Sequence, residues 1–428
     1  MTTVPGRPDV GKDPGPGAAA ASRPLVVRSE AIDLTGTLLG RLPAASGALA
    51  WVHDGQGLIG WGEVARLEVS GPDRFAAAQR WWQERVAAFT VDDRVGVPGS
   101  GPVAFASFAF DDESDVPSVL VVPEVVLGRR DGVAWLTTMG TPPRLSSPQP
   151  LTRPDRLRYA QGQTSVTAYR AAVEEAVRRI GRGELAKVVL AHDLVATADQ
   201  SIDPRFLLGG LAERYPDCWT FAVEGLLGAT PELLVALHDG QVTSRVLAGT
   251  TARGGDAAED HRRHEALLRS DKDREEHRYA AESLIEALAP HCSAVAASET
   301  PYLLELSNVA HLATDVAGTA LAGRDVLDLV SAVHPTAAVG GTPTDRAIVA
   351  IREIEAMDRG RYAGPVGWVD AEGDGEWGIA LRCAQLDGHT ARLFAGCGIV
   401  ADSDPDAEVL EAQAKFVPVR DALEGVGD

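Results

Sequence analysis

Several features that would define a class of function are scarce or absent in this chain. Its four cysteines show no CxxC pairing, which argues against a zinc site or a disulfide scaffold and indicates a reducing, cytoplasmic environment. No apolar run reaches the about 18 residues of a membrane span. The nearest run, PSVLVVPEVVLG, is interrupted by Pro123 and Glu124. Basic residues are outnumbered 40 to 61 by acidic ones, and the net charge of −21 argues against nucleic acids and anionic membranes as partners.

Nucleotide-binding motifs are also missing, because neither a Walker loop nor a GxGxxG motif stands at a strand-to-helix turn.

At 428 residues we expect one large domain or two intimate ones. Residues 1–23 are rich in Pro, Gly and Ala and lack the pattern of a signal peptide, which predicts a disordered leader. Residues 24–160 show short strands without concentrated reactive groups, which indicates a scaffold region. Residues 161–428 alternate strands and helices in no regular βαβ order, which predicts mixed α+β layers rather than a Rossmann sheet.

Two acidic pairs in the C-terminal half have helical spacing. In DPDAEVLEAQAKF, Glu408, Glu411 and Lys415 fall on one face of a predicted helix. Asp273 and Glu276, in SDKDREEH, have the same three-residue spacing. Two such pairs on separate helices can converge into an all-oxygen site for Mg²⁺, and the lysine indicates an anionic ligand beside it. The alternative is two solvated, salt-bridged helix faces.

Other segments of this half combine reactive groups with glycines: GELAKVVLAH, GATPELL, LAGTTARG, HPTAAVGGTP, RGRYAGPVGW, ALRCAQL and AGCGIV. Together with SDKDREEH and in this order, they resemble the chorismate-utilising enzymes over about Thr164 to Val419. Within that family the chain is most similar to the isochorismate synthases of menaquinone and siderophore pathways. The resemblance implies an anthranilate synthase component I-like fold, with layered antiparallel or mixed sheets and helices outside. It also implies chorismate as substrate, Mg²⁺ as cofactor and a monomer.

Isochorismate formation moves a hydroxyl group: water attacks C2 of the diene while the C4 hydroxyl leaves. Lys187, at the start of the strand in LAKVVLAHDL, is the candidate base, because partial desolvation disfavours its ammonium form. The alternative is an exposed surface charge. Glu232, in ATPELL, matches the general acid of the family and must stay protonated for that role. Its alternative is a helix-start glutamate after Pro231, whose pKa the helix dipole would lower.

The resemblance also assigns a substrate-binding set. It consists of Ala248, Gly249, Thr250, His311, Ala338, Tyr362, Arg382, Gly398 and Lys415. Arg382 would hold a substrate carboxylate through both guanidinium nitrogens. Tyr362 would donate to the same carboxylate unless it is a core strand tyrosine, and His311 would lie beside the substrate unless it is structural. Gly249, like Gly396 and Gly398 in AGCGIV, would let backbone N–H groups approach the ligand.

The acidic pairs take metal roles by the same resemblance. Glu276 and Glu411 are the expected direct Mg²⁺ ligands. Asp273 and Glu408 would bind directly or through water, and the ring carboxylate of the substrate would complete the shell.

Three positions separate the branches of the family. Members that use ammonia generally lack the base that Lys187 supplies. Aminodeoxychorismate synthases commonly carry a nucleophilic lysine where this chain has Ala248. Members that expel pyruvate tend to carry threonine where this chain has Ala338, since a threonine at the ring steers the enolpyruvyl group toward elimination.

The sequence therefore predicts a Mg²⁺-dependent isochorismate synthase, an isomerase, which we expect to serve menaquinone synthesis. One alternative is a salicylate synthase, a lyase that eliminates pyruvate from the same intermediate. Another is a non-catalytic chorismate- or metal-binding paralogue, which the presence of both Lys187 and Glu232 disfavours.

Overall fold

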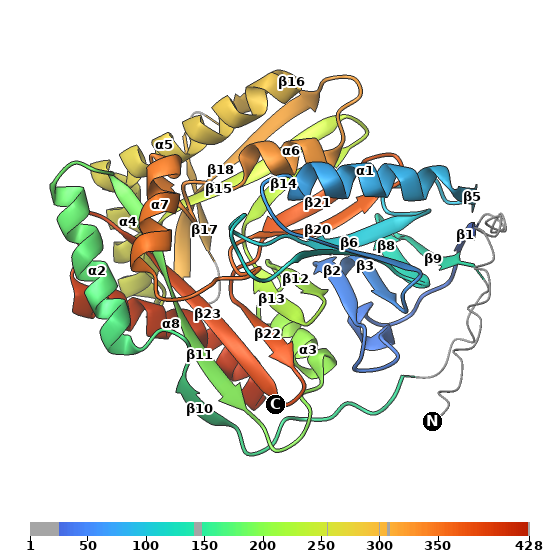
Figure 1. The fold of residues 1–428 in the computed structure, drawn as a ribbon, viewed down its shortest axis with the longest axis horizontal. Helices are drawn as coiled ribbons and strands as arrows, with labels where there is room; N and C mark the ends of the chain where they lie inside the picture. Colours follow the sequence, from blue (N-terminus) through green and yellow to red (C-terminus); the bar gives the residue numbers. More distant parts are fainter. Residues whose placement is uncertain (1–24, 141–147, 255, 299, 306–308, 427–428) are drawn as a thin grey trace, which may run out of the picture.

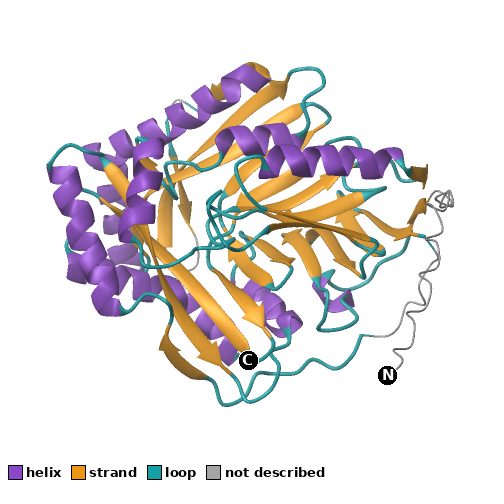
Figure 2. Cartoon of the chain, in the orientation of Figure 1, coloured by secondary structure: helices purple, strands orange, loops and turns teal. Residues whose placement is uncertain are grey.

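The computed structural model describes residues 25–140, 148–254, 256–298, 300–305 and 309–426. Within these ranges, Ala252, Lys272 and Glu276 are described by their backbone alone. The expected leader lies outside these residues. Within them, the chain forms two large β-sheets with helices around them (Figures 1 and 2). This arrangement confirms the layered α+β architecture.

The first sheet has 13 strands in the described part of the chain. In spatial order these are β10 (Arg158–Gln161), β11 (Lys187–Thr197), β23 (Thr390–Ile399), β22 (Cys383–Asp387), β13 (Leu226–Thr230), β12 (Trp219–Val223), β2 (Leu49–His53), β3 (Gln56–Trp61), β8 (Val125–Arg130), β9 (Val133–Met139), β1 (Leu25–Ala31) and β5 (Phe89–Asp93), with β19 (Gly341–Thr342) beside β11. The β1–β5 pair is parallel, and the other recorded pairs are antiparallel. The expected scaffold and catalytic regions meet in this sheet where β12 pairs with β2.

The second sheet has 10 strands among the described residues. In spatial order these are β16 (Cys292–Ala297), β18 (Val309–Ala320), β15 (Gln241–Ala252), β14 (Leu233–His238), β21 (Gly375–Ile379), β20 (Pro365–Asp370), β6 (Val103–Ser107), β7 (Ser118–Val122) and β4 (Ala65–Val69), with β17 (Tyr302–Glu305) beside β18. Here the two regions meet where β20 pairs with β6. Both regions therefore contribute strands to both sheets.

The helices of the described chain lie mainly against the strands of the C-terminal half. They are α1 (Arg74–Ala87), α2 (Val166–Gly181), α3 (Pro204–Arg214), α4 (Ala257–Arg269), α5 (Asp271–Leu288), α6 (Val326–Val333), α7 (Thr344–Ile354) and α8 (Pro405–Glu424), with short 3-10 turns at Leu39–Arg41 and Ala289–His291. Helices α2, α4, α5, α7 and α8 gather on one side of the molecule, around β11, β15, β18 and β23 (Figure 1). No helix in the described ranges combines the length and apolarity needed to cross a membrane.

Local sequence explains where the helices near the site begin and end. Ser165 caps α2 by accepting a hydrogen bond from the backbone N–H of Ala168. Asp404 caps α8 in the same way, and Gly425, with a φ of 60°, ends it. Polar contacts link the two sheets at Glu376 of β21, which accepts from Nε1 of Trp51 in β2 at 2.9 Å and forms an ion pair with Arg130 of β8.

Candidate active site

Lys187 is the first residue of β11, where it pairs with Thr342 of β19, and its side chain is half-buried. Gly398 of β23 lies opposite Val189, and a Cβ added at Gly398 would lie 2.9 Å from Cε of Lys187. A larger residue at this position would therefore displace the lysine side chain. The space left by the glycine is occupied by Lys187, and the approach of a ligand to its backbone N–H remains a prediction.

Glu232 lies in the link between β13, which ends at Thr230, and β14, which begins at Leu233. The alternative of a helix-start glutamate is wrong, because both flanking segments are hydrogen-bonded into sheets. The side chain is only 7% exposed, and burial raises the pKa of its carboxyl to about 8, with the positive charge of Lys187 opposing that rise. The carboxyl is therefore mostly protonated at neutral pH, as a general acid requires.

A cavity of about 310 Å³ borders Glu232. Its walls come from β14, β15, α5, the end of α6 and residues 334–338. Ala338 lines this cavity too, so the candidate acid and the position expected to control the branch share one space. The volume is at the lower end of the about 300–1,000 Å³ usual for small-molecule sites. A threonine at 338 would take up part of it.

Tyr362 lies in the turn before β20 rather than in a strand, and it belongs to the buried core, so its role as a substrate ligand stays a prediction. Its buried ring stacks on Phe394, with 4.9 Å between the ring centroids. The hydroxyl faces Gly396, where an added Cβ would lie 2.9 Å from Oη. Burial raises the pKa of this hydroxyl above its ordinary value, which keeps it a neutral donor.

Gly249 occupies a β-bulge in β15. Ala248 and Thr250 pair with consecutive residues of β18, which leaves Gly249 unpaired with a φ of 77°. This left-handed backbone favours glycine. A Cβ added at Gly249 would lie 3.3 Å from Cβ of Asp273, so the bulge packs against the first turn of α5.

His311 of β18 is held by polar contacts at both ring nitrogens. Nε2 lies 3.4 Å from Nη2 of Arg382, and Nδ1 lies 2.9 Å from Oγ1 of Thr250. An arginine only donates, so Nε2 accepts and Nδ1–H donates to the threonine. Burial, together with the positive charges of Arg382 and Lys415, lowers the pKa of His311 to about 3. The structure thus joins a neutral imidazole to the guanidinium that the sequence assigned to substrate binding.

His277 supports the site and was missed by the sequence interpretation. It is buried, with Nδ1 3.3 Å from the carbonyl oxygen of Ala248 and Nε2 2.7 Å from Oγ1 of Thr314. A carbonyl only accepts, so Nδ1 carries the proton and ties α5 to the bulge. Its position directly after Glu276 in the acidic motif is the signal that could have found it.

The expected helix at the C-terminus is present as α8, and Lys415 points from it toward β23. Its Nζ lies 2.7 Å from Oε1 of Glu411 and 2.7 Å from the carbonyl oxygen of Gly396. The ammonium group therefore stands between the acidic helix face and the glycine strand, where an anionic ligand would meet it.

Glu408 and Glu411 form a potential cation site. One ligand atom of each lies within 4.8 Å of the other and of Sγ of Cys397. Oε1 of Glu408 accepts from Ser403 at 2.8 Å, whereas Oε2 is buried without a hydrogen-bond partner among the described residues. Burial, followed by the negative charge of Glu411, raises the pKa of Glu408. A buried oxygen without a partner beside a second carboxylate fits a hard divalent ion such as Mg²⁺.

The neighbouring thiol is a poor match for such an ion, because Mg²⁺ prefers oxygen ligands. Burial raises the pKa of the Cys397 thiol to about 12. Asp273 is not part of the Glu408–Glu411 group among the described side chains, and the side chain of Glu276 lies outside them. Convergence of the two acidic pairs on one metal ion remains a prediction.

Comparisons with known proteins identify the family of this chain. The family model described as "Chorismate binding enzyme" matches residues 48–142 and 143–424. The isochorismate synthase DhbC of Bacillus subtilis is 42% identical over 261 residues, which are 58% of this chain and 65%, slightly under two thirds, of that protein. A putative isochorismate synthase MenF of Mycobacterium tuberculosis is 35% identical over 339 residues, 76% of this chain and 87% of that protein.

A solved structure confirms the expected fold. The crystal structure of a putative 2,3-dihydroxybenzoate-specific isochorismate synthase, DhbC from Bacillus anthracis, superposes with a TM-score of 0.75 and 31% identity. The superposition covers 90% of this chain and 98% of that one. With two sheets shared between both halves and a family match over most of its length, the chain belongs to the family of chorismate-binding enzymes.

Proposed function

We propose that this chain is an isochorismate synthase that converts chorismate into isochorismate with the help of Mg²⁺. The proposal rests chiefly on Glu232, a buried carboxyl with a pKa of about 8 that lies within electrostatic reach of Lys187. A carboxyl that stays protonated next to a potential base is the arrangement that a concerted acid and base step requires. The names of the two curated relatives and of the solved structure support the same activity.

In the proposed reaction, Lys187 takes a proton from water as the water oxygen bonds to C2 of the ring. The double bonds shift, the C4–O bond breaks, and Glu232 gives its proton to the leaving hydroxyl, which departs as water. One water enters and one leaves, so the net change is an isomerisation. The proton gained by Lys187 must return to Glu232 before the next turnover.

Arg382 would bind a substrate carboxylate, with His311 fixing its orientation. Nε2 of the neutral imidazole accepts a hydrogen bond from one N–H of the Arg382 guanidinium. The remaining N–H groups of Arg382 would then be available to the substrate carboxylate. The hydroxyl of Tyr362 and the ammonium of Lys415 would complete this anion-binding set. Such contacts would suit a substrate with two carboxylates.

Glu408 and Glu411 would hold Mg²⁺, with Asp273 and Glu276 as further ligands from α5. Bound there, Mg²⁺ would neutralise and orient the ring carboxylate of the substrate. The unpartnered buried oxygen of Glu408 supports this assignment. We further propose a cytoplasmic monomer, and the four buried, unpaired cysteines support a reducing compartment.

The direct test is incubation of the purified protein with chorismate and Mg²⁺, followed by chromatographic separation of the products and a pyruvate assay. Isochorismate without pyruvate, lost on addition of EDTA, is the expected result. Salicylate with equimolar pyruvate would instead make the chain a salicylate synthase, despite Ala338. Absence of turnover would contradict both activities and favour a binding-only paralogue.

A further inference from the structure

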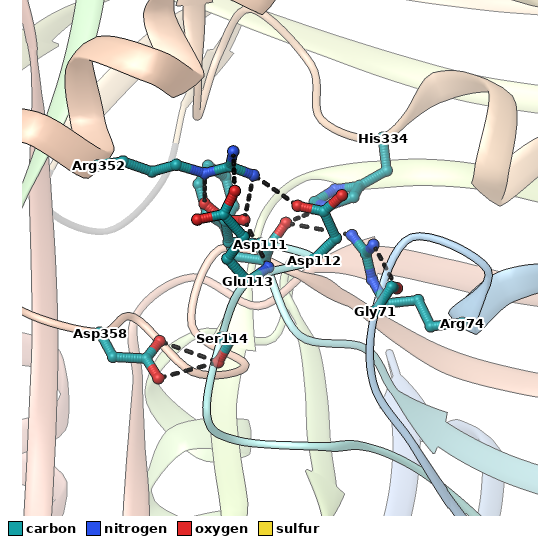
Figure 3. Close-up of polar contacts among 10 residues, drawn as sticks. Gly71, Arg74, Asp111, Asp112, Glu113, Ser114, His334, Arg352 and Asp358 are labelled. Atoms are coloured by element: carbon teal, nitrogen blue, oxygen red, sulfur yellow. Dashed lines mark hydrogen bonds and ion pairs between the residues drawn. The ribbon is translucent and has the colours of Figure 1, made fainter.

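The connection between β6 and β7 carries an acidic loop, residues 110–115, that contacts α7 and the segment after it (Figure 3). Arg352 of α7 forms ion pairs with Asp111, Asp112 and Glu113 of this loop. Oγ of Ser114 lies 2.9 Å from a carboxylate oxygen of Asp358. The N-terminal region, interpreted from sequence as a scaffold without concentrated reactive groups, therefore contacts α7 and the residues after it through this loop.

Phe110, the first residue of the acidic loop, makes a second set of contacts. The backbone N–H of Phe110 donates to Gly360 at 2.9 Å, and its carbonyl oxygen accepts from Nε2 of His334 at 2.9 Å. The guanidinium of Arg359 lies over the Phe110 ring, 4.3 Å from its centroid. The acidic loop thus packs against Arg359 through the ring of Phe110.

Arg359 and Glu355 form a buried ion pair, with exposed fractions of 4% and 9%. Nε of Arg359 donates to Glu355 at 2.8 Å. Its Nη2 donates to the carbonyl oxygen of Val189 at 2.7 Å, and its Nη1 to that of Val339 at 2.9 Å. Glu355 also accepts from the backbone N–H of Ala191. One pair therefore contacts β11 just beyond Lys187 and the loop residue next to Ala338.

We propose that the Arg359–Glu355 pair, packed on the acidic loop, is the positioning element that sets the strand of Lys187 against the loop of Ala338. This inference rests on the proposed function, because the two segments matter together only if base and branch-controlling residue face one substrate. Arg359 touches neither reacting group and acts through the backbone. Misplacement of a reacting group by about 1 Å can lower the rate about 10²-fold, so a restraint on the backbone that carries Lys187 should affect kcat.

Arg359→Lys is the informative variant. It keeps the charge beside Glu355, but a single ammonium cannot reproduce the planar fork that reaches a carboxylate and two carbonyls. Arg205 offers a matched control, since it pairs with Asp203 with both side chains 4% exposed and also donates to backbone carbonyls, among them that of Gln149 at 3.1 Å. Those carbonyls belong to segments that carry none of the candidate site residues.

We expect both lysine variants to lose stability, and Arg359→Lys alone to lose kcat, by about 10²-fold per folded molecule at unchanged KM for chorismate. Hydrogen exchange provides a readout that does not depend on activity. Amides of residues 187–191 and 336–341 should exchange faster together in Arg359→Lys and not in Arg205→Lys. Arg352→Gln, a half-exposed change, should give the same pattern more weakly and covers the case in which Arg359→Lys does not fold.

Unchanged exchange in both segments, or an equal loss of kcat in Arg205→Lys, would overturn the inference. A wild-type protein without turnover of chorismate would count against the proposed function alone. In that case the exchange comparison still decides whether the pair couples the two segments.

Discussion

Glu232→Gln removes the proton that the proposed reaction delivers while keeping the size of the side chain. The structure predicts two opposite consequences. Activity should fall by about 10²–10⁴-fold, the usual contribution of a general acid. Stability at neutral pH should rise, because the fold holds this carboxyl in a place where its charged form is disfavoured.

The size of the stability change follows from the pKa. Between the ordinary pKa of 4.5 and the folded-state pKa of about 8, the unfolded chain loses the Glu232 proton while the folded chain keeps it. The free energy of unfolding contributed by this group therefore falls by about 1.4 kcal/mol per pH unit over that range. At pH 7 the accumulated cost is about 3 kcal/mol, which glutamine avoids because it does not ionise.

Urea unfolding followed by circular dichroism, at pH values from 4.5 to beyond 8, measures this difference directly. The variant and the wild type should converge near pH 4.5 and separate as the pH rises toward 8, above which the gap should level off. Glu174→Gln, an exposed change on α2, is the control and should show no such gap.

A gap that does not depend on pH would refute the assignment of Glu232 as a buried, protonated carboxyl. Retention of more than about a tenth of the activity would remove it from the role of general acid. In the wild type, kcat/KM should also decline as the pH rises past about 8, because the free enzyme then loses the acid.

Three further changes test the other roles. Lys187→Ala should lower kcat by about 10²–10⁴-fold while calorimetry still detects chorismate binding, and near-normal turnover would exclude it as the base. Glu411→Ala should weaken Mg²⁺ binding together with activity, and undiminished Mg²⁺ affinity by calorimetry would rule it out as a ligand. Ala338→Thr should introduce pyruvate release, measured with a coupled dehydrogenase assay. If no pyruvate appears, position 338 does not control the branch.

Much of the site could be predicted from sequence where the relevant neighbours lie within a few residues. The spacing of Glu408, Glu411 and Lys415 predicted a helix and a common face, and α8 provides both. Lys187 stands at the start of a strand as expected. The helix-start alternative for Glu232 is wrong, although a proline followed by glutamate is typical of a helix start. Here pairing of the flanking strands with β22 and β21 decides the conformation.

By itself, the sequence determined the order of the elements, the helix caps and the identity of the reactive groups, since these depend on local spacing and side-chain chemistry. Only the tertiary structure decided their chemical state. The pKa of Glu232 follows from burial between segments distant in the chain, and the neutral state of His311 from burial beside Arg382, 71 residues away. Likewise, Arg359 reaches Val189 across 170 residues. Desolvation and long-range contacts exist only once the chain has folded, so no local pattern could encode them.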